Sequence, residues 1–365
     1  MGSLKFSFGA PFISKVRGLL FNRSCGRPTR MAVRLSVGRI VCDFLVLFAI
    51  AIPLLIFHEW VKPYKRGFYC DDESIRYPYR PSTVTRQALI VIGILIPTLL
   101  ILFTELFRTL TWERKEAHLF RTYEYRDKNV HRFIVRLYTF IGYFFVGVCF
   151  NQLMVDIAKY TIGRQRPHFM DVCRPNVGYS NCDTHMREYI TEFQCTGTDQ
   201  YLIHESQLSF YSGHSAFSFY AAWYTSFYLQ ARLYRPLISR LVLPVIQFSL
   251  FAGAAYVAYT RISDYKHHWS DVLVGMFMGS AIGIINAIFI ANVFARREIP
   301  AGIKTGRHYQ MDSPTHHVAF NGDAERGGVT VHIQDNVAGP HTVIQKEVQV
   351  PQQVRYSTLV RGDAN

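Results

Sequence analysis

Residues 88–107 read ALIVIGILIPTLLILFTELF, an apolar run with a single acid, Glu105, near its end. A helix needs about 20 apolar residues to cross the hydrocarbon core of a bilayer. One such block could be a buried helix of a soluble protein, but six in one chain favour a membrane protein. The sequence therefore predicts an all-α, polytopic membrane protein with six transmembrane helices, at residues 40–61, 88–107, 133–158, 215–233, 240–259 and 272–294.

These blocks divide the chain into three regions. Residues 1–39 form a basic arm, residues 40–294 a membrane domain that carries the catalytic residues, and residues 295–365 a polar tail. The tail has scattered Gly, Pro, Gln and Asp without sustained periodicity, so we expect it to be disordered. Within the arm, the stretch 4–21 either lies on an anionic membrane surface or stays disordered.

The charges of the connecting segments predict the topology. The arm has eight Lys or Arg and no acid, which is typical of a cytosolic segment, and six spans return the C-terminus to the same side. The loop 108–132, expected in the cytosol, has seven basic residues, whereas five basic residues meet six acids in the outer loop 159–209. The net charge of +14 lies largely at span ends, so it does not indicate nucleic-acid binding.

Seven cysteines are distributed over both sides of the predicted membrane. Disulfides form on the non-cytosolic side, where three complete pairings of the four outer cysteines remain open. Cys25, Cys42 and Cys149 are expected to be free thiols, and the four outer cysteines are Cys70, Cys173, Cys182 and Cys195.

Three short polar segments lie at the outer ends of predicted spans: KYTIGRQRP at 159–167, SFYSGHS at 209–215 and RISDYKHHWSD at 261–271. A lone Lys or Arg there is usually a snorkelling anchor. Two Arg, one Lys and two His on the face where positive charge is least expected instead predict a site for a tetrahedral oxyanion. The guanidinium of Arg is a planar fork of donors that matches phosphate, and the ammonium of Lys supplies a point charge. The N-terminus of a helix adds backbone N–H groups that can bind an anion. The predicted phosphate ligands are Lys159, Arg166, Ser212, Gly213 and Arg261.

The two histidines can take complementary catalytic roles, because phosphate-ester hydrolysis needs a nucleophile and a proton donor. His267 and Asp271 are four residues apart, which on a helix places them on one face. Asp271 would then accept the Nδ1–H of His267 and leave Nε2 free to attack phosphorus. His214 would protonate the leaving alkoxide.

The pattern Lys-x6-Arg-Pro, Ser-Gly-His and Arg-x5-His-x3-Asp resembles the lipid phosphate phosphatases, also called phospholipid phosphatases or type 2 phosphatidate phosphatases, and their animal branch in particular. The wider superfamily includes vanadium haloperoxidases and bacterial acid phosphatases, so the resemblance implies a helical core of that kind. It covers roughly residues 40–294. Two departures, Thr260 and Tyr211 at positions where Ser and Pro are common, remove no catalytic group.

The resemblance implies His267 as the nucleophile of a phosphohistidine intermediate, with Asp271 as its partner and His214 as the acid. It implies no metal and no cofactor, and substrates such as phosphatidate, lysophosphatidate, ceramide-1-phosphate and sphingosine-1-phosphate. It further implies a homo-oligomer and an active site outside the cytosol. The plasma membrane is the expected location, with the endoplasmic reticulum and the Golgi as alternatives.

Other readings remain open for several residues and for the whole chain. His268 is expected to have a structural role or to lie at the substrate rim, His168 to pack at the pocket rim, and Glu105 to lie at the cytosolic interface. An intramembrane acid is functional by default, but Asp156 lies near enough to the interface for a structural hydrogen bond to explain it. Competing functions are a catalytically inactive lipid-binding relative, a transporter, and vanadate-peroxidase or phosphotransfer chemistry in the same pocket.

Overall fold

A computed structural model describes residues 33–114, 120, 122–177, 179, 188–234 and 239–298 of the chain. These residues belong to one compact unit that spans residues 1–303. Most of residues 1–39, most of the tail 295–365 and Cys182 lie outside the described residues, so the structure does not test the domain limits predicted for them.

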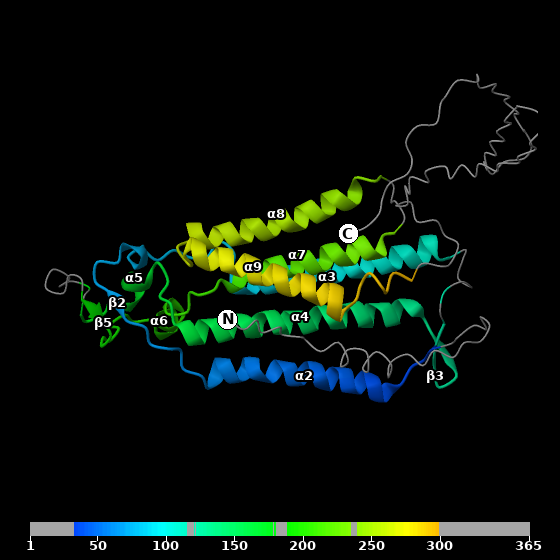
Figure 1. The fold of residues 1–365 in the computed structure, drawn as a ribbon, viewed down its shortest axis with the longest axis horizontal. Helices are drawn as coiled ribbons and strands as arrows, with labels where there is room; N and C mark the ends of the chain where they lie inside the picture. The colour runs from blue at the N-terminus through cyan, green and yellow to red at the C-terminus, as the bar shows by residue number, and fades with distance from the viewer. Residues whose placement is uncertain are drawn as a thin grey trace, which may run out of the picture. The chain divides into compact units, whose positions relative to one another are not determined.

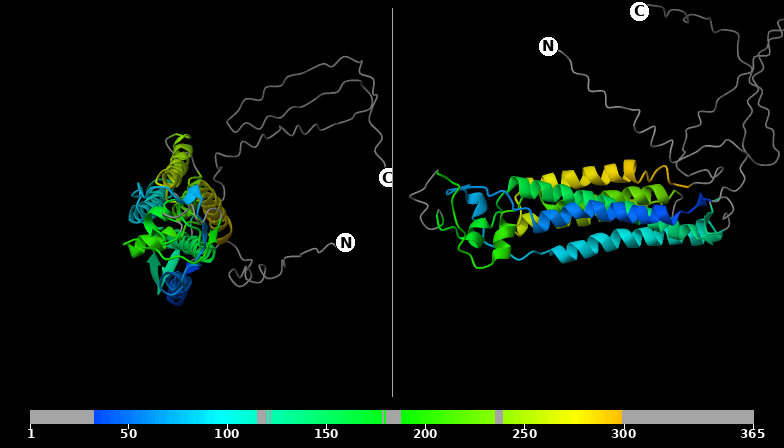
Figure 2. Two further views of the ribbon diagram at one scale, coloured as in Figure 1. Left: turned by 90° about the vertical axis from the view of Figure 1, so that its left-hand side faces the viewer. Right: turned by 90° about the horizontal axis from the view of Figure 1, so that it is seen from below.

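Long helices that run alongside one another make up most of the described chain (Figures 1 and 2). Short strands and helices join them at the two ends. The long helices are α2 (Val37–Glu59), α3 (Arg86–Phe107), α4 (Arg132–Ile162), α7 (Gly213–Arg232), α8 (Val242–Ser263) and α9 (Trp269–Ile285). Two π-helical turns continue α3 and α9, namely η2 (Arg108–Trp112) and η5 (Asn286–Ile290).

Among the described residues, five helices are long and apolar enough to cross a membrane. The chain is therefore a multi-pass integral membrane protein. These five cover Val37–Phe57, Arg86–Trp112, Arg132–Ile162, Val242–Ser263 and Trp269–Ile290. The helix predicted as the fourth span, α7, is not among them, because Ser, His, Gln and Tyr side chains lower its hydropathy.

Helix α7 lies against α3, α4, α8 and α9, and most of its residues are buried. Its tyrosines recur every four residues and so lie on one face. The hydroxyls of Tyr220 and Tyr224 donate to the carbonyls of Phe144 and Phe140 on α4, each over 2.6 Å. The Tyr228 hydroxyl donates to Glu105 over 2.9 Å. The three tyrosine hydroxyls of α7 are thus hydrogen-bonded inside the bundle.

Close packing of α7 against α9 depends on small residues of α9. Gly275, Gly279 and Gly283 recur every four residues and face α7. A Cβ at Gly275 would lie 2.6 Å from the Ser212 carbonyl, and one at Gly279 would clash with the Ala216 carbonyl. The missing side chains let the two backbones approach each other, which brings the beginnings of both helices together.

One end of the bundle carries the connections that build the functional site (Figure 1). Here a two-stranded antiparallel sheet joins residues far apart in sequence, and the Cys173–Cys195 disulfide lies beneath a small core of Phe68, Phe169 and Phe193. Cys70 is disulfide-bonded as well, whereas Cys42 and Cys149 are free, as predicted. The elements at this end are β2 (Phe68–Tyr69), η1 (Glu73–Ile75), α5 (Phe169–Cys173), β5 (Tyr189–Ile190) and α6 (Gln200–Ser206).

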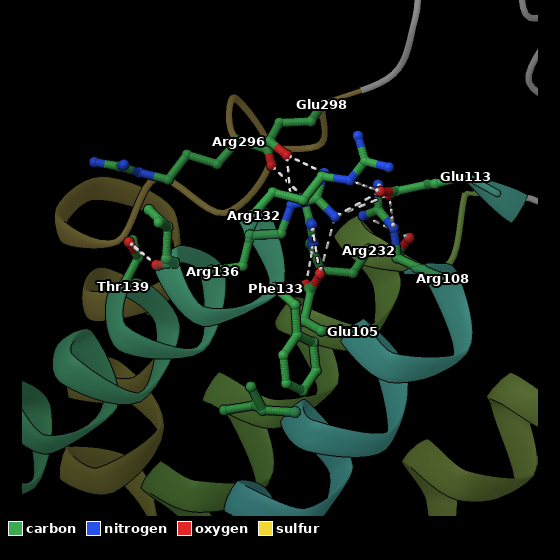
Figure 3. Close-up of polar contacts among 12 residues, drawn as sticks. Glu105, Arg108, Glu113, Arg132, Phe133, Arg136, Thr139, Arg232, Arg296 and Glu298 are labelled. Atoms are coloured by element: carbon green, nitrogen blue, oxygen red, sulfur yellow. Dashed lines mark hydrogen bonds and ion pairs between the residues drawn. The ribbon is translucent and has the colours of Figure 1, made fainter. Parts of the chain in front are cut away.

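The opposite end holds a small sheet, β1 (Val33–Arg34), β3 (Tyr123–Tyr125) and β4 (Lys128–Val130), and a buried charge cluster (Figure 3). Glu105 accepts two hydrogen bonds from Arg232, at 2.6 and 2.9 Å. Arg136 donates to Glu113 and to Glu298, which connects α4 to the segment that follows α9. Glu105, expected at the cytosolic interface, is fully buried inside the bundle, where Arg232 and Arg136 pair with it.

Candidate active site

The three predicted motifs meet at the end of the bundle that carries α5 and α6. Their residues line a cavity of about 720 Å³, a size typical of ligand pockets. Of the eight predicted site residues, six line it: Lys159, Arg166, Gly213, His214, Arg261 and His267. The other two, Ser212 and Asp271, are fully buried behind them.

The first motif leaves α4 through a left-handed turn. Lys159 lies in the last turn of α4, and Gly163 ends the helix with φ +57°. A Cβ at Gly163 would clash with the Tyr64 carbonyl, so glycine is required by both conformation and space. The turn lets Arg166 reach the cavity, where its backbone N–H donates to the Ser206 carbonyl over 2.7 Å.

Arg166 is oriented by a carboxylate that the sequence reasoning missed. Its guanidinium donates to Glu205 on α6 over 2.8 Å, and Glu205 also accepts from Arg86 over 2.9 Å. Burial alone would raise the pKa of Glu205, but Arg166, Lys159 and Arg86 lower it to about 2. Glu205 is therefore ionised at neutral pH and holds the Arg166 fork at the cavity wall.

The second motif begins α7. Ser212 is the N-cap: its hydroxyl accepts from the Ser215 backbone N–H over 3.4 Å and from the Ser215 hydroxyl over 3.0 Å. The Ser212 N–H donates to the Asp271 carbonyl over 3.1 Å. The structure thus gives Ser212 a capping role, and its N–H is not available to phosphate as the sequence reasoning expected. Gly213 is the first residue of α7 and lines the cavity.

His214, in the first turn of α7, lines the cavity. Its ring forms a hydrogen bond with the backbone of Val84. Within the described part of the chain, its Nε2 is buried and has no hydrogen-bond partner. A proton donor for a bound ligand needs such a nitrogen, so the geometry suits a general acid.

The third motif positions a buried guanidinium and an ammonium. Arg261, 1% exposed, donates to Asp264 over 2.9 Å, and Asp264 also accepts from the Thr83 backbone and hydroxyl, each over 2.8 Å. The Lys266 ammonium lies 3.7 Å from the centre of the Tyr79 ring. Burial lowers the pKa of Lys266, and Arg166 and Arg261 lower it further, to about 8.

His267 precedes α9, which begins at Trp269, so the expected helical relation between His267 and Asp271 is wrong. The His267 Nδ1 lies 3.9 Å from Asp271 Oδ2, too far for a direct hydrogen bond. Between them lies Ser209, whose hydroxyl is 3.4 Å from His267 Nδ1 and donates to Asp271 over 2.5 Å. The Ser209 hydroxyl therefore bridges the Asp271 carboxylate and the His267 ring.

The remaining contacts of Asp271 fix its carboxylate. Arg164 donates to its Oδ1 over 2.5 Å, and the His268 backbone N–H donates to its Oδ2 over 3.2 Å. His268 is the N-cap of α9, which is the structural role expected for it. Sequence reasoning missed Arg164 and Ser209, although both lie inside the motifs that it singled out.

The electrostatics of the pocket favour a neutral His267 and an anionic ligand. Burial lowers the pKa of His267 well below its usual value, and Arg166 and Lys159 lower it further. His267 therefore carries an unprotonated ring nitrogen at neutral pH. His168 lies behind the pocket, where its Nδ1 is 2.7 Å from the Tyr265 carbonyl and burial lowers its pKa to about 4.

Comparison with known proteins agrees with this arrangement. Residues 140–295 match the model of the PAP2 superfamily. The chain is 39% identical to human phospholipid phosphatase 2 over 259 residues (71% of this chain, 84% of the relative). It is 36% identical to rat phospholipid phosphatase 1 over 281 residues (77% and 95%).

A putative phosphatidate phosphatase of Drosophila melanogaster is 39% identical over 275 residues (71% of each chain). No solved structure gives a significant match. The matched region contains all three motifs, and the chain covers most of the length of each relative. This chain therefore belongs to the phospholipid phosphatase family of the PAP2 superfamily.

Proposed function

We propose that this phosphatase hydrolyses phosphate monoesters of membrane lipids without a metal ion, through a phosphohistidine on His267. The substrates would be phosphatidate, lysophosphatidate, ceramide-1-phosphate and sphingosine-1-phosphate. The site would face the extracellular space or a lumen, with α7 as the fourth of six spans and both termini in the cytosol.

One observation carries the proposal: the cavity has a cationic end and an apolar wall. Lys159, Arg166 and Arg261 line it together with His214 and His267. The same cavity continues along apolar side chains of three membrane helices, Leu54 of α2, Ile90 and Ile94 of α3, and Val148 of α4. A phosphate joined to a hydrocarbon chain matches both parts.

The first chemical step forms a phosphorus–nitrogen bond. Ser209 and Asp271 orient Nδ1 of His267, which leaves Nε2 to attack phosphorus. Three cations stabilise the charge on the phosphoryl oxygens as the ester bond breaks. The negative charge of the bound phosphate favours the imidazolium form of His214, whose Nε2–H gives its proton to the leaving lipid alkoxide, so that the alcohol departs and His214 becomes neutral.

The second step reverses these roles. A water molecule attacks the phosphohistidine while His214, now neutral, takes one of its protons. The phosphorus–nitrogen bond breaks, inorganic phosphate leaves, and His267 returns to its starting form. Arg and Lys supply the positive charge that a metal ion supplies in other phosphatases, so EDTA should not inhibit the enzyme.

The test is phosphate release from phosphatidate in detergent micelles with EDTA present. His267→Ala should lower kcat by at least about 10⁴-fold, because the nucleophile is lost. Vanadate, which mimics the five-coordinate phosphorus intermediate, should inhibit the unaltered protein. Full activity of His267→Ala would overturn the proposal.

His268→Asn is the matched control, since it alters the neighbouring histidine and asparagine is a good N-cap. Acid-labile phosphate trapped during turnover should map to residue 267 in the unaltered protein and in this variant. Phosphate on residue 268 would refute the assignment of the nucleophile.

A further inference from the structure

The last part of the connection between α2 and α3, residues 77–85, lies against the functional site, although it contains none of the three motifs. We name it the α2–α3 loop. The Tyr77 N–H donates over 2.9 Å to the carbonyl of Pro167, the last residue of the first motif. The Thr83 N–H and hydroxyl both donate to Asp264, which lies in the third motif, each over 2.8 Å. Contacts with two motifs thus hold this loop beside the cavity.

Val84 is fixed within the α2–α3 loop by its two neighbours. Thr83 on one side is bonded to the Asp264 carboxylate. Thr85 on the other side is the N-cap of α3, and its hydroxyl accepts from the Ala88 N–H over 3.2 Å. The Val84 side chain also packs against the hydrophobic core of the bundle. The Val84 backbone therefore has little freedom to move.

The Val84 backbone is a hydrogen-bond partner of the His214 ring. The His214 Nε2 has no such partner among the described residues, so Nδ1 makes the bond to Val84. An imidazolium has an N–H on both ring nitrogens, and a backbone carbonyl is a group that can accept one of them. In the acid form of His214, the Val84 carbonyl therefore accepts Nδ1–H, and Nε2–H remains for transfer to the substrate.

We propose that Thr83 is a positioning residue, which holds the α2–α3 loop so that the Val84 carbonyl keeps His214 aligned with the leaving group. This inference rests on the proposed function, in which His214 is the general acid. Asp264 also accepts from the Arg261 guanidinium over 2.9 Å. One carboxylate thus connects a phosphate-binding cation to the loop that orients the acid, so the acid keeps its place relative to the bound phosphate.

The role of Thr83 can be separated from a merely structural one by the leaving group. The alkoxide of a lipid alcohol is a strong base and needs a proton as the ester bond breaks, whereas nitrophenolate is stable without one. Misalignment of His214 should therefore slow the reaction of a lipid ester and spare that of a nitrophenyl ester. Damage to phosphate binding or to the fold should slow both.

The experiment measures phosphohistidine formation in a single turnover, so that the later hydrolysis step does not contribute. The two substrates, in mixed micelles, are phosphatidate and a nitrophenyl phosphate with an alkyl chain on its ring. Thr83→Val removes the hydroxyl that donates to Asp264, and the rate with phosphatidate should fall about tenfold. The rate with the nitrophenyl ester should fall less than about twofold. Thr83→Ser keeps the hydroxyl and should restore most of the rate.

Thr196→Val is the matched control. It removes a threonine hydroxyl that donates over 2.7 Å to the Arg174 carbonyl, at the same end of the bundle but outside the α2–α3 loop. Both rates should stay unchanged. Asp264→Asn weakens the contact with Thr83 from the other side and tests the loop if Thr83→Val does not fold. Because it also weakens the pair with Arg261, it should slow both substrates, and the lipid ester more.

A double variant decides whether Thr83 acts through the acid. In a His214→Ala background, Thr83→Val should have no further effect on either rate, because the group that it positions is already absent. The same loss in both backgrounds, or an equal loss for both substrates in Thr83→Val alone, would overturn the positioning role and leave the proposed function intact. An unaltered protein that forms no phosphohistidine with either substrate would overturn the proposed function itself.

Discussion

The hydroxyl of Ser209 lies between His267, the proposed nucleophile, and the carboxylate of Asp271. It donates to Asp271 over 2.5 Å and lies 3.4 Å from His267 Nδ1, while the two outer groups are 3.9 Å apart. Because the serine proton goes to Asp271, its lone pair is left to accept Nδ1–H of His267. This arrangement fixes the tautomer in which Nε2 is unprotonated.

Ser209→Ala should therefore lower kcat by about 10- to 100-fold with little change in KM, as expected for a lost buried hydrogen bond. The rate of phosphohistidine formation in a single turnover should fall by the same factor, because Nε2 is less often in the reactive form. Ser209→Thr keeps the hydroxyl and should restore most of kcat. If KM rises while kcat stays constant, Ser209 does not position His267.

On the alkaline side, the pH dependence of kcat/KM should reflect the deprotonation of Lys266. Its pKa is lowered to about 8, so it attracts the phosphate below that pH and loses its charge above it. We expect kcat/KM, which reflects the free enzyme, to fall as the pH rises through about 8. Lys266→Arg keeps the charge and should move this limb to higher pH. An identical limb in the variant would exclude Lys266 as its cause.

The residue types and spacing of the motifs were enough to predict the residues that gather at one cavity. They could not predict which hydrogen-bond donor of a motif pairs with which acceptor in the folded chain. The Ser212 N–H donates to the backbone carbonyl of Asp271 because α7 and α9 begin side by side. Only the tertiary packing of the two helices creates this contact, so the local sequence does not show it. Glu205 carries no local motif at all; only the fold brings α6 against Arg166.

At the scale of elements, the seam between α7 and α9 sets the distance between the two histidines. His214 lies in the first turn of α7, and His267 comes immediately before the N-cap of α9. Gly275 and Gly279 allow the carbonyls of α7 to lie against the α9 backbone. A wider seam would separate the acid from the nucleophile.

Gly279→Ala should lower both the thermal stability and kcat. The added Cβ would clash with the Ala216 carbonyl, and overpacking of this kind costs about 1–3 kcal/mol. Gly253→Ala on α8 is the matched control, since a Cβ there meets no atom within 4 Å. It should leave kcat unchanged and raise the midpoint of unfolding slightly, because alanine favours a helix more than glycine does. If Gly279→Ala and Gly253→Ala change kcat and stability equally, the close packing of α7 against α9 does not set the distance between His214 and His267.

Five of the six predicted spans are helices that are apolar enough to cross a membrane among the described residues, and the exception is α7. This helix buries its tyrosine hydroxyls against the carbonyls of α4, so its composition resembles that of a soluble helix. Helical periodicity also fails at His267. The four-residue spacing to Asp271 predicts that both residues lie on one helix face, but the helix begins only at Trp269.

At the scale of the molecule, the bundle has a polar cluster at each end, and the two clusters differ in whether their arginines line a cavity or are buried in ion pairs. At the site end, Lys159, Arg166 and Arg261 line the cavity. The other end holds Arg108, Arg136 and Arg232, which are paired with Glu105, Glu113 and Glu298 and bonded to the segment after α9 (Figure 3). We infer that this second cluster holds the helix ends together and takes no part in the chemistry.

Glu105→Leu should therefore lower the free energy of unfolding by about 3–5 kcal/mol, because it leaves the buried Arg232 guanidinium without its carboxylate. The double variant Glu105→Leu, Arg232→Met removes both charges and should recover much of the loss. As a control, Lys65→Met breaks an exposed pair with Glu192 and should cost less than about 1 kcal/mol. Thermal unfolding in detergent micelles measures all three.

Activity separates a structural from a catalytic role for this cluster. Glu105 lies on α3 at the end of the bundle far from His267, so its loss should reduce the amount of folded enzyme and leave kcat per folded molecule unchanged (Figure 1). The folded fraction can be counted by the phosphohistidine trapped in a single turnover. If kcat per trapped site falls as well, the charge cluster is coupled to the active site through the helices, and the two ends do not act independently.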